Sequence, residues 1–151
     1  MKTVFNIHGK VIFDGKVNIG RGFSLSVGKQ SEFFFGNDLI ATGKSAIVSS
    51  GKSNVVFGNN CLISWDVLIL NNDFHSIIDR NSKQIINKSK DITIGNNVWI
   101  GCKSTILKGS TINDHIIIGA NSLVIGSLND MNSIYAGTPT TRLKKDVKWE
   151  M

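Results

Sequence analysis

A six-residue repeat in the second half of the chain constrains the fold more than any other feature of the sequence. From residue 94 onward, every sixth residue is isoleucine or valine: Ile94, Ile100, Ile106, Ile112, Ile118 and Val124. The residue four places after each of these is mostly small. The position before that is enriched in types that tolerate a left-handed backbone: Asn97, Lys103, Gly109, His115 and Asn121. A period of six fits neither an α-helix, with about 3.6 residues per turn, nor the two-residue alternation of an ordinary strand.

Short strands that turn a corner every six residues fit this period. One large aliphatic side chain then fills the interior of each wall, three walls complete a triangular coil, and coils stack at about 4.8 Å through backbone hydrogen bonds. The first half repeats the pattern less regularly, with FGNDLI, ATGKSA and IVSSGK from residues 35, 41 and 47 and, after a slip, FGNNCL and ISWDVL from residues 57 and 63. An antiparallel sandwich gives no reason for such a period. The sequence therefore predicts an all-β fold, a parallel β-helix that forms one domain over residues 1–151.

The repeat stops between Ile69 and Ile92, and the polar stretch NNDFHSIIDRNSKQIINKSKD fills the gap. We expect residues 71–91 to form a loop that projects from a corner, because solenoids accept insertions there and commonly place them on the working face. His75 lies at the base of this loop. Histidine titrates near neutrality and is the commonest general base, although an isolated loop histidine is more often structural or simply solvated.

Composition narrows the class of protein. The chain carries 17 basic and 11 acidic residues, a net charge of +6, which favours anionic or phosphorylated ligands. No aromatic-interleaved basic motif of a nucleic-acid-binding module is present. No apolar run approaches the roughly 18 residues of a membrane span, and we expect no signal peptide. Cys61 and Cys102 show no pairing pattern, so we expect a reduced, cytoplasmic protein.

The stretches IGNNVWIG, STILKGSTI, IGANSLV and IYAGTPTTRLKK, together with the loop histidine, resemble the hexapeptide-repeat acetyltransferases. The resemblance is greatest to the small sugar acetyltransferases of surface-polysaccharide gene clusters, and it covers roughly residues 17 to 145. It implies that the β-helix is left-handed, that three chains form a homotrimer, and that acetyl-CoA lies in a groove between neighbouring subunits. It also implies that His75, in the motif DFH and 24 residues before Trp99, is the catalytic base.

A catalytic role for His75 agrees with the chemistry of sugar acetylation. A sugar hydroxyl is a poor nucleophile at neutral pH, and a neutral imidazole can take its proton as the oxygen attacks the thioester carbonyl. The developing oxyanion needs a donor, which the resemblance places at a backbone N–H near Cys102. Either Asp73 or a backbone carbonyl would orient the imidazole. We expect the acceptor to meet residues around the loop, namely Trp65, Asn71 and Phe74, although the two aromatic rings serve equally well as packing beneath it.

The resemblance also implies a binding face for the acetyl donor, acetyl-CoA. Trp99 would pack against the pantetheine arm, and the amide of Ala120 would hydrogen-bond to it. Gly101 and Gly119 would allow the backbone to approach the ligand closely. Cys102 would complete this donor-binding set.

The segment that leaves the last predicted coil is basic and would meet the phosphates of CoA. Its candidate residues are Arg142, Lys144 and Lys145. Here the chain departs from the family, because Thr140-Thr141 replaces the usual small-then-basic pair after the proline, so which base meets the phosphates stays open. We expect about residues 138–151 to form a short tail or a helical turn near Trp149 that covers the open edge of the last coil.

A metal site is not expected. A zinc-dependent carbonic anhydrase on this fold would need three histidines, two of them close in sequence, whereas the three here are 67 and 40 residues apart. We therefore predict an acetyl-CoA-dependent O-acetyltransferase acting on a sugar in surface-polysaccharide (capsule or O-antigen) biosynthesis. The nearest alternative is N-acetylation of an amino sugar on a nucleotide carrier, since an amine needs less activation. A non-catalytic solenoid that binds a partner or scaffolds a complex is an alternative of another class, and the histidine-bearing loop argues against it.

Overall fold

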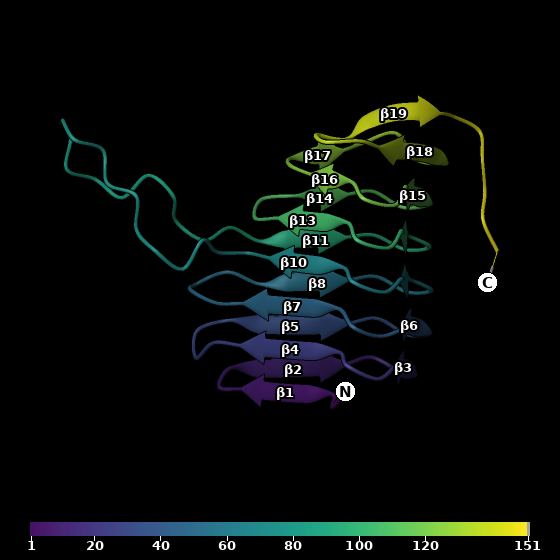
Figure 1. Cartoon of the computed structure of the whole chain (residues 1–151), viewed down its shortest axis with the longest axis horizontal. Helices are drawn as coiled ribbons and strands as arrows, with labels where there is room; N and C mark the ends of the chain where they lie inside the picture. The colour runs from purple at the N-terminus through teal and green to yellow at the C-terminus, as the bar shows by residue number, and fades with distance from the viewer. Residues whose placement is uncertain (151) are drawn as a thin grey trace.

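Short strands stacked in a prism form the body of the protein (Figure 1). The computed structural model describes residues 1–150 and contains three sheets, one for each wall. Sheet A consists of β1 (Val4–Ile7), β4 (Ser24–Val27), β7 (Ala46–Ser49), β10 (Leu68–Leu70), β13 (Thr105–Leu107) and β16 (Leu123–Val124). Sheet B consists of β2 (Lys10–Phe13), β5 (Glu32–Phe35), β8 (Val55–Phe57), β11 (Ile92–Ile94), β14 (Thr111–Ile112) and β17 (Ser127–Leu128). Sheet C consists of β3 (Val17–Ile19), β6 (Leu39–Ala41), β9 (Leu62–Ile63), β12 (Trp99–Ile100), β15 (Ile116–Ile118), β18 (Ser133–Ala136) and β19 (Thr141–Lys144).

Each coil takes one strand from sheet A, one from sheet B and one from sheet C. Every strand from β1 to β18 pairs in parallel with its counterpart one coil away, as β12 does with β9 and β15. The chain therefore winds as the left-handed parallel β-helix that the six-residue repeat and the resemblance predicted.

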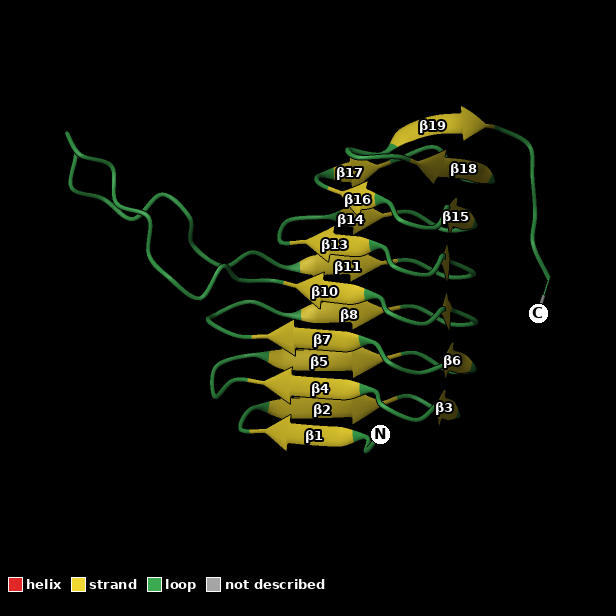
Figure 2. Ribbon diagram, in the orientation of Figure 1, coloured by secondary structure: helices red, strands yellow, loops and turns green. Residues whose placement is uncertain are grey.

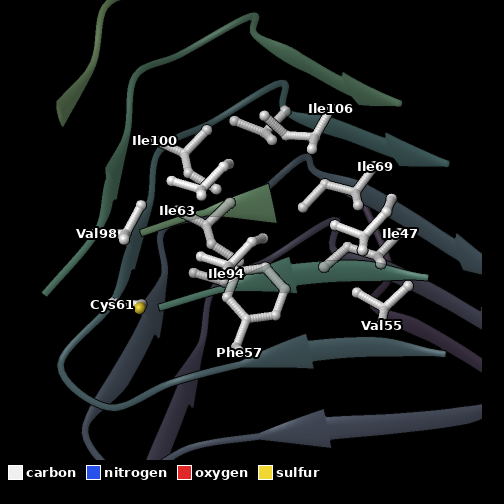
Figure 3. Packing of buried hydrophobic residues seen from close by; sticks show 14 of the residues in the cluster. Ile47, Val55, Phe57, Cys61, Ile63, Ile69, Ile94, Val98, Ile100 and Ile106 are labelled. Atoms are coloured by element: carbon white, nitrogen blue, oxygen red, sulfur yellow. The ribbon is translucent and has the colours of Figure 1, made fainter. Parts of the chain in front are cut away.

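A ladder of aliphatic side chains fills the interior (Figure 3). The residues at the start of each six-residue unit lie there in register: Ile63, Ile100 and Ile118 occupy equivalent places on neighbouring strands of sheet C, and all three are fully buried. The small residues four places later are buried as well, among them Ser104 and Ser110. The predicted inward face of the repeat is thus confirmed.

The corners explain why the repeat uses asparagine and lysine where it does. Asn97, Lys103, His115 and Asn121 all have positive φ, between 52° and 61°, the left-handed conformation predicted for this position of the repeat.

Along the corner between sheets B and C, side-chain oxygens accept hydrogen bonds from the corner amides of the preceding coil. Asn59 Oδ1 accepts from Asn37 N at 2.8 Å, Asn96 Oδ1 from Asn59 N at 2.9 Å, and Asp114 Oδ1 from Asn96 N at 2.7 Å. This ladder satisfies backbone donors that the sheets do not reach.

One long loop interrupts the stack between β10 and β11, and it projects well away from the prism (Figure 2). It spans residues 71–91, as predicted, and a single antiparallel bridge joins Ile78 to Ile85 within it. The loop leaves the body at the corner between sheets A and B, because β10 belongs to sheet A and β11 to sheet B.

The carboxyl-terminal segment differs from the prediction. Of the two predicted forms, the helical turn is wrong, since residues 1–150 contain no helix; Thr141–Lys144 form β19, which pairs antiparallel with β18, and residues 145–150 form no regular element. Strand β19 covers the open edge of sheet C, so the predicted capping task is performed by a strand. No helix in the described part of the chain could cross a bilayer.

Candidate active site

Asn71 fixes the start of the loop to the body. Its side chain is fully buried, and its Nδ2 donates to Ser49 Oγ at 3.0 Å and to Ser53 O at 3.1 Å. Its Oδ1 accepts from Ser50 N at 2.8 Å. These bonds link the loop to the preceding coil, and the expected contact between Asn71 and an acceptor would require them to break.

A tight turn then presents His75. The His75 N–H donates to Asp73 O at 2.8 Å, and Phe74 between them has φ of 66°, so the three residues form a γ-turn with positive φ. Asn72 Oδ1 supports the turn by accepting from Phe74 N at 2.7 Å. Such a turn is rare and strained, above all at a bulky residue, and strained backbone of this kind clusters at functional sites.

A hollow of about 330 Å³ opens beside His75. Residues from both ends of the loop and from the neighbouring coil line it: Lys52, Asn72, Phe74, His75, Ser76, Ile85, Asn87, Lys88 and Ser89. The lining offers hydroxyl groups, amides and two ammonium groups, and it includes no carboxylate. A polar ligand with hydroxyl groups or negative charge suits such a lining.

Asp73 faces cationic and amide donors. Its Oδ2 accepts from Lys108 Nζ, and from Asn87 Nδ2 at 2.9 Å. The hydrogen bond from Lys108 is the main cause that lowers the pKa of Asp73, followed by that from Asn87. No hydrogen bond joins this carboxylate to the imidazole of His75 within residues 1–150, so the orienting role of Asp73 stays a prediction.

Trp99 lies on the outer face of sheet C with about a third of its surface exposed. Its Nε1 donates to Ser64 Oγ at 3.1 Å, and its ring packs at 6.0 Å between centroids against Trp149 of the tail. Trp65, at the next corner, is half-exposed. Sheet C thus presents an aromatic surface where the resemblance implies the pantetheine arm.

The corner between sheets C and A has free backbone donors. Cys102 and Ala120 occupy the same place in their six-residue units, and within residues 1–150 neither backbone N–H donates to an acceptor. At the corner between sheets B and C the equivalent positions are Asn or Asp, whose side chains satisfy the preceding amide. These two amides are therefore candidate donors to a carbonyl or oxyanion.

Gly101 and Gly119 lie against the next coil, and their predicted close approach to a ligand stays a prediction. A Cβ on Gly101 would lie 2.6 Å from Ile118 O and 2.7 Å from Ala120 N, and a Cβ on Gly119 would lie 2.8 Å from the Cβ of Ala136. All of these atoms belong to the next coil. The close approach that the glycines allow here is between stacked coils.

The basic exit segment is partly neutralised. Arg142 on β19 pairs with the carboxylate of Asp130, and Lys145 Nζ lies 3.7 Å from the same group. Tyr135 donates to Asp130 at 3.0 Å. Among the described residues Lys144 forms no ion pair, so it is the base in this segment whose charge is unpaired.

The structure brings some predicted residues together and keeps others apart. His75, Asp73 and Phe74 share the loop at the corner between sheets A and B, whereas Trp99 lies on sheet C and Ala120 at the corner between C and A. The predicted base and the predicted donor-binding residues therefore occupy different corners of one chain.

Sequence reasoning missed Lys108 and Asn87. Both contact Asp73, and Asn87 also donates to His75 O at 2.8 Å. Lys108 stands at a corner of the unit ILKGST, a place typical of solvated side chains, and Asn87 lies in a stretch without periodicity. Neither residue carries a signal in the repeat.

Comparisons with known proteins agree with this geometry. Residues 91–126 match the bacterial transferase hexapeptide family (six repeats). The chain is 30% identical over 145 residues to the putative lipopolysaccharide biosynthesis O-acetyl transferase WbbJ of Escherichia coli K12, covering 87% of this chain and 73% of that protein. It is 29% identical over 143 residues to the polysialic acid O-acetyltransferase of Escherichia coli O1:K1, covering 95% of this chain and 43% of that one, so it spans less than half of that relative.

Among solved structures, a mutant of AntD, an N-acyltransferase from Bacillus cereus in complex with dTDP and coenzyme A, has the same fold. The TM-score is 0.79 at 22% identity, over 95% of this chain and 78% of that one. The coils, the projecting loop and these relatives define the class of protein. The chain belongs to the hexapeptide-repeat family of bacterial transferases.

Proposed function

We propose that the chain transfers an acetyl group from acetyl-CoA to a hydroxyl group of a sugar during the biosynthesis of a surface polysaccharide. The observation that carries this proposal is the placement of His75, which a strained turn holds exposed beside a hollow lined by both polar and apolar side chains. The relatives support it, since the names of both sequence relatives describe O-acetyltransferases. Because acetyl-CoA is an intracellular metabolite, we also propose a cytoplasmic location.

In the proposed reaction, His75 accepts the proton of the sugar hydroxyl while the oxygen attacks the thioester carbonyl. The backbone N–H of Cys102 stabilises the negative charge that develops on the carbonyl oxygen, and the N–H of Ala120 bonds the pantetheine arm. His75 then returns the proton to the departing thiolate, so that an acetyl ester and free CoA leave. Trp99 packs against the arm, and Lys144 and Arg142 are the candidates for the phosphates.

We further propose that each site is shared between neighbouring chains of a homotrimer. The support is that His75 and the donor-binding residues lie at different corners of one chain. A ring of three chains would place the loop of one against sheet C of the next. Mixing two inactive variants, His75→Ala and Ala120→Trp, tests this idea. After the subunits exchange, some interfaces combine the intact His75 of one chain with the intact Ala120 of its neighbour, and these should be active. A mixture that stays inactive after verified exchange would place each site within one chain.

The function is tested by incubating the purified chain with acetyl-CoA and a panel of sugars and following the release of free thiol. We expect His75→Ala to lower kcat by roughly 10²- to 10⁴-fold while the KM for acetyl-CoA changes little. A variant that keeps more than about a tenth of the activity would remove His75 from the mechanism. Thiol release with amino sugars alone would identify an N-acetyltransferase. If none of the acceptors supports thiol release at any concentration, the proposal is refuted.

A further inference from the structure

One side chain from the body reaches the turn that carries His75. Lys108 follows β13, at the corner between sheets A and B in the coil after the loop. Its Nζ donates to Asp73 Oδ2 and, at 3.0 Å, to Asn87 O. The Lys108 side chain is 19% exposed, whereas that of Asp73 is 42% exposed, so solvent still reaches the pair from the Asp73 side. Lys108 thus binds both ends of the loop at once.

Asn87 connects the two ends of the loop to each other. Its Nδ2 donates to Asp73 Oδ2 at 2.9 Å and to His75 O at 2.8 Å, and its Oδ1 accepts from Ile77 N at 2.6 Å. One amide group therefore holds the backbone at and after His75 together with the side chain of Asp73 before it. Asp73, on the near side of the γ-turn, is held by Lys108 and Asn87 together.

We infer that Lys108 and Asn87 are positioning residues that hold the strained turn at Phe74 and thereby place the imidazole of His75. The inference rests on the proposed function. A positive φ at a bulky residue persists only where the surroundings impose it, and these bonds act beside the one from Phe74 N to Asn72 Oδ1. Misplacement of a catalytic group by about 1 Å can cost on the order of 10²-fold in rate, so a device that fixes the turn acts on kcat.

The charge on Asp73 keeps this arrangement intact over the working range of pH. The bonds from Lys108 and Asn87 lower the pKa of Asp73 below its ordinary value. The carboxylate therefore stays ionised down to a pH below that at which a free aspartate gains a proton. Near neutrality Asp73 therefore stays ionised, and the pH dependence of kcat should not report this carboxylate.

The test combines kinetics with hydrogen exchange. We expect Lys108→Met to lower kcat by roughly 10- to 100-fold with the KM for acetyl-CoA within about twofold of wild type. Lys108→Arg, which can still donate to both oxygens, should recover most of the loss. The matched control is Lys83→Met, which removes the same charge from the tip of the same loop, outside the hollow and its contacts, and should leave kcat unchanged.

Two further results separate positioning from other roles. In a His75→Ala background, Lys108→Met should lower the residual kcat by less than about twofold, because a residue acting through His75 has nothing left to position. Multiplicative losses would overturn the inference. Exchange of the His75 amide should be several-fold faster in Lys108→Met than in wild type or Lys83→Met, whether or not the protein is an acetyltransferase. Unchanged exchange would refute the clamp itself, whereas faster exchange in a chain without transferase activity would refute only the proposed function.

Discussion

Gly101 has two possible reasons to be a glycine: it lets neighbouring coils stack closely, or it lets the backbone approach acetyl-CoA. The substitution Gly101→Ala distinguishes them. The new Cβ would lie 2.6 Å from Ile118 O, roughly 0.8 Å inside ordinary van der Waals contact, with two further backbone atoms within 2.8 Å. Relief requires the two coils to separate, which would stretch the 2.8 Å hydrogen bond from Gly101 N to Ile118 O beyond useful length. Overpacking and the lost bond together should cost about 1–3 kcal/mol. For a chain of this size that is a fall in Tm of roughly 3–10 °C.

The measurement is the Tm of Gly101→Ala beside that of Gly28→Ala. The control makes the same substitution where the nearest atoms, the Cα and Cβ of Ser50, are 3.3 Å away, and we expect its Tm to stay within a few degrees of wild type. If instead Gly101→Ala keeps the wild-type Tm and only weakens acetyl-CoA binding, the glycine serves the ligand and the packing argument is wrong.

Two other features give direct tests. Burial raises the pKa of the Cys61 thiol to about 11, so at pH 8 only about one molecule in a thousand carries its thiolate. A thiol reagent should therefore label one cysteine, Cys102, in the native chain and both cysteines in denaturant. Rapid labelling of both cysteines in the native chain would contradict the burial of Cys61. Trp149 Nε1 donates to Asn97 O at 2.8 Å, and its ring packs at a tilt against Trp99. Trp149→Ala removes both contacts, so trypsin should cut the tail faster while the body stays resistant. An unchanged cleavage rate would show that other contacts hold the tail.

The periodic part of the fold could be predicted because its causes are local and repeat. Each coil needs one aliphatic side chain inside each wall and a residue in the left-handed backbone conformation near the corner. The six-residue unit contains both features in its sequence. Ile100 is fully buried and Asn97 has positive φ for these reasons. The loop was predicted by the same logic, as the place where the unit fails.

The contents of the loop could not be predicted in this way. Its geometry depends on single contacts between residues far apart in sequence, such as Lys108 with Asp73, which are 35 residues apart and belong to no period. The burial of Asn71 has the same origin, since its partners Ser49 and Ser53 are side chains of the previous coil. A polar residue at a loop base looks available for a ligand until the partner hydroxyls are known.

The tail shows how the open end of a solenoid overrides local preference. The charged stretch LKKDVKWEM has residues suited to a helical turn, and local propensity is a weak prior. Strand β18, however, would otherwise end sheet C with unpaired N–H and C=O groups along one edge. Residues 141–144 meet that demand by pairing with β18, and the ion pair between Arg142 and Asp130 holds the returning strand. An exposed backbone edge offers several hydrogen bonds at once, whereas an isolated helical turn is only marginally stable, so residues 141–144 form a strand.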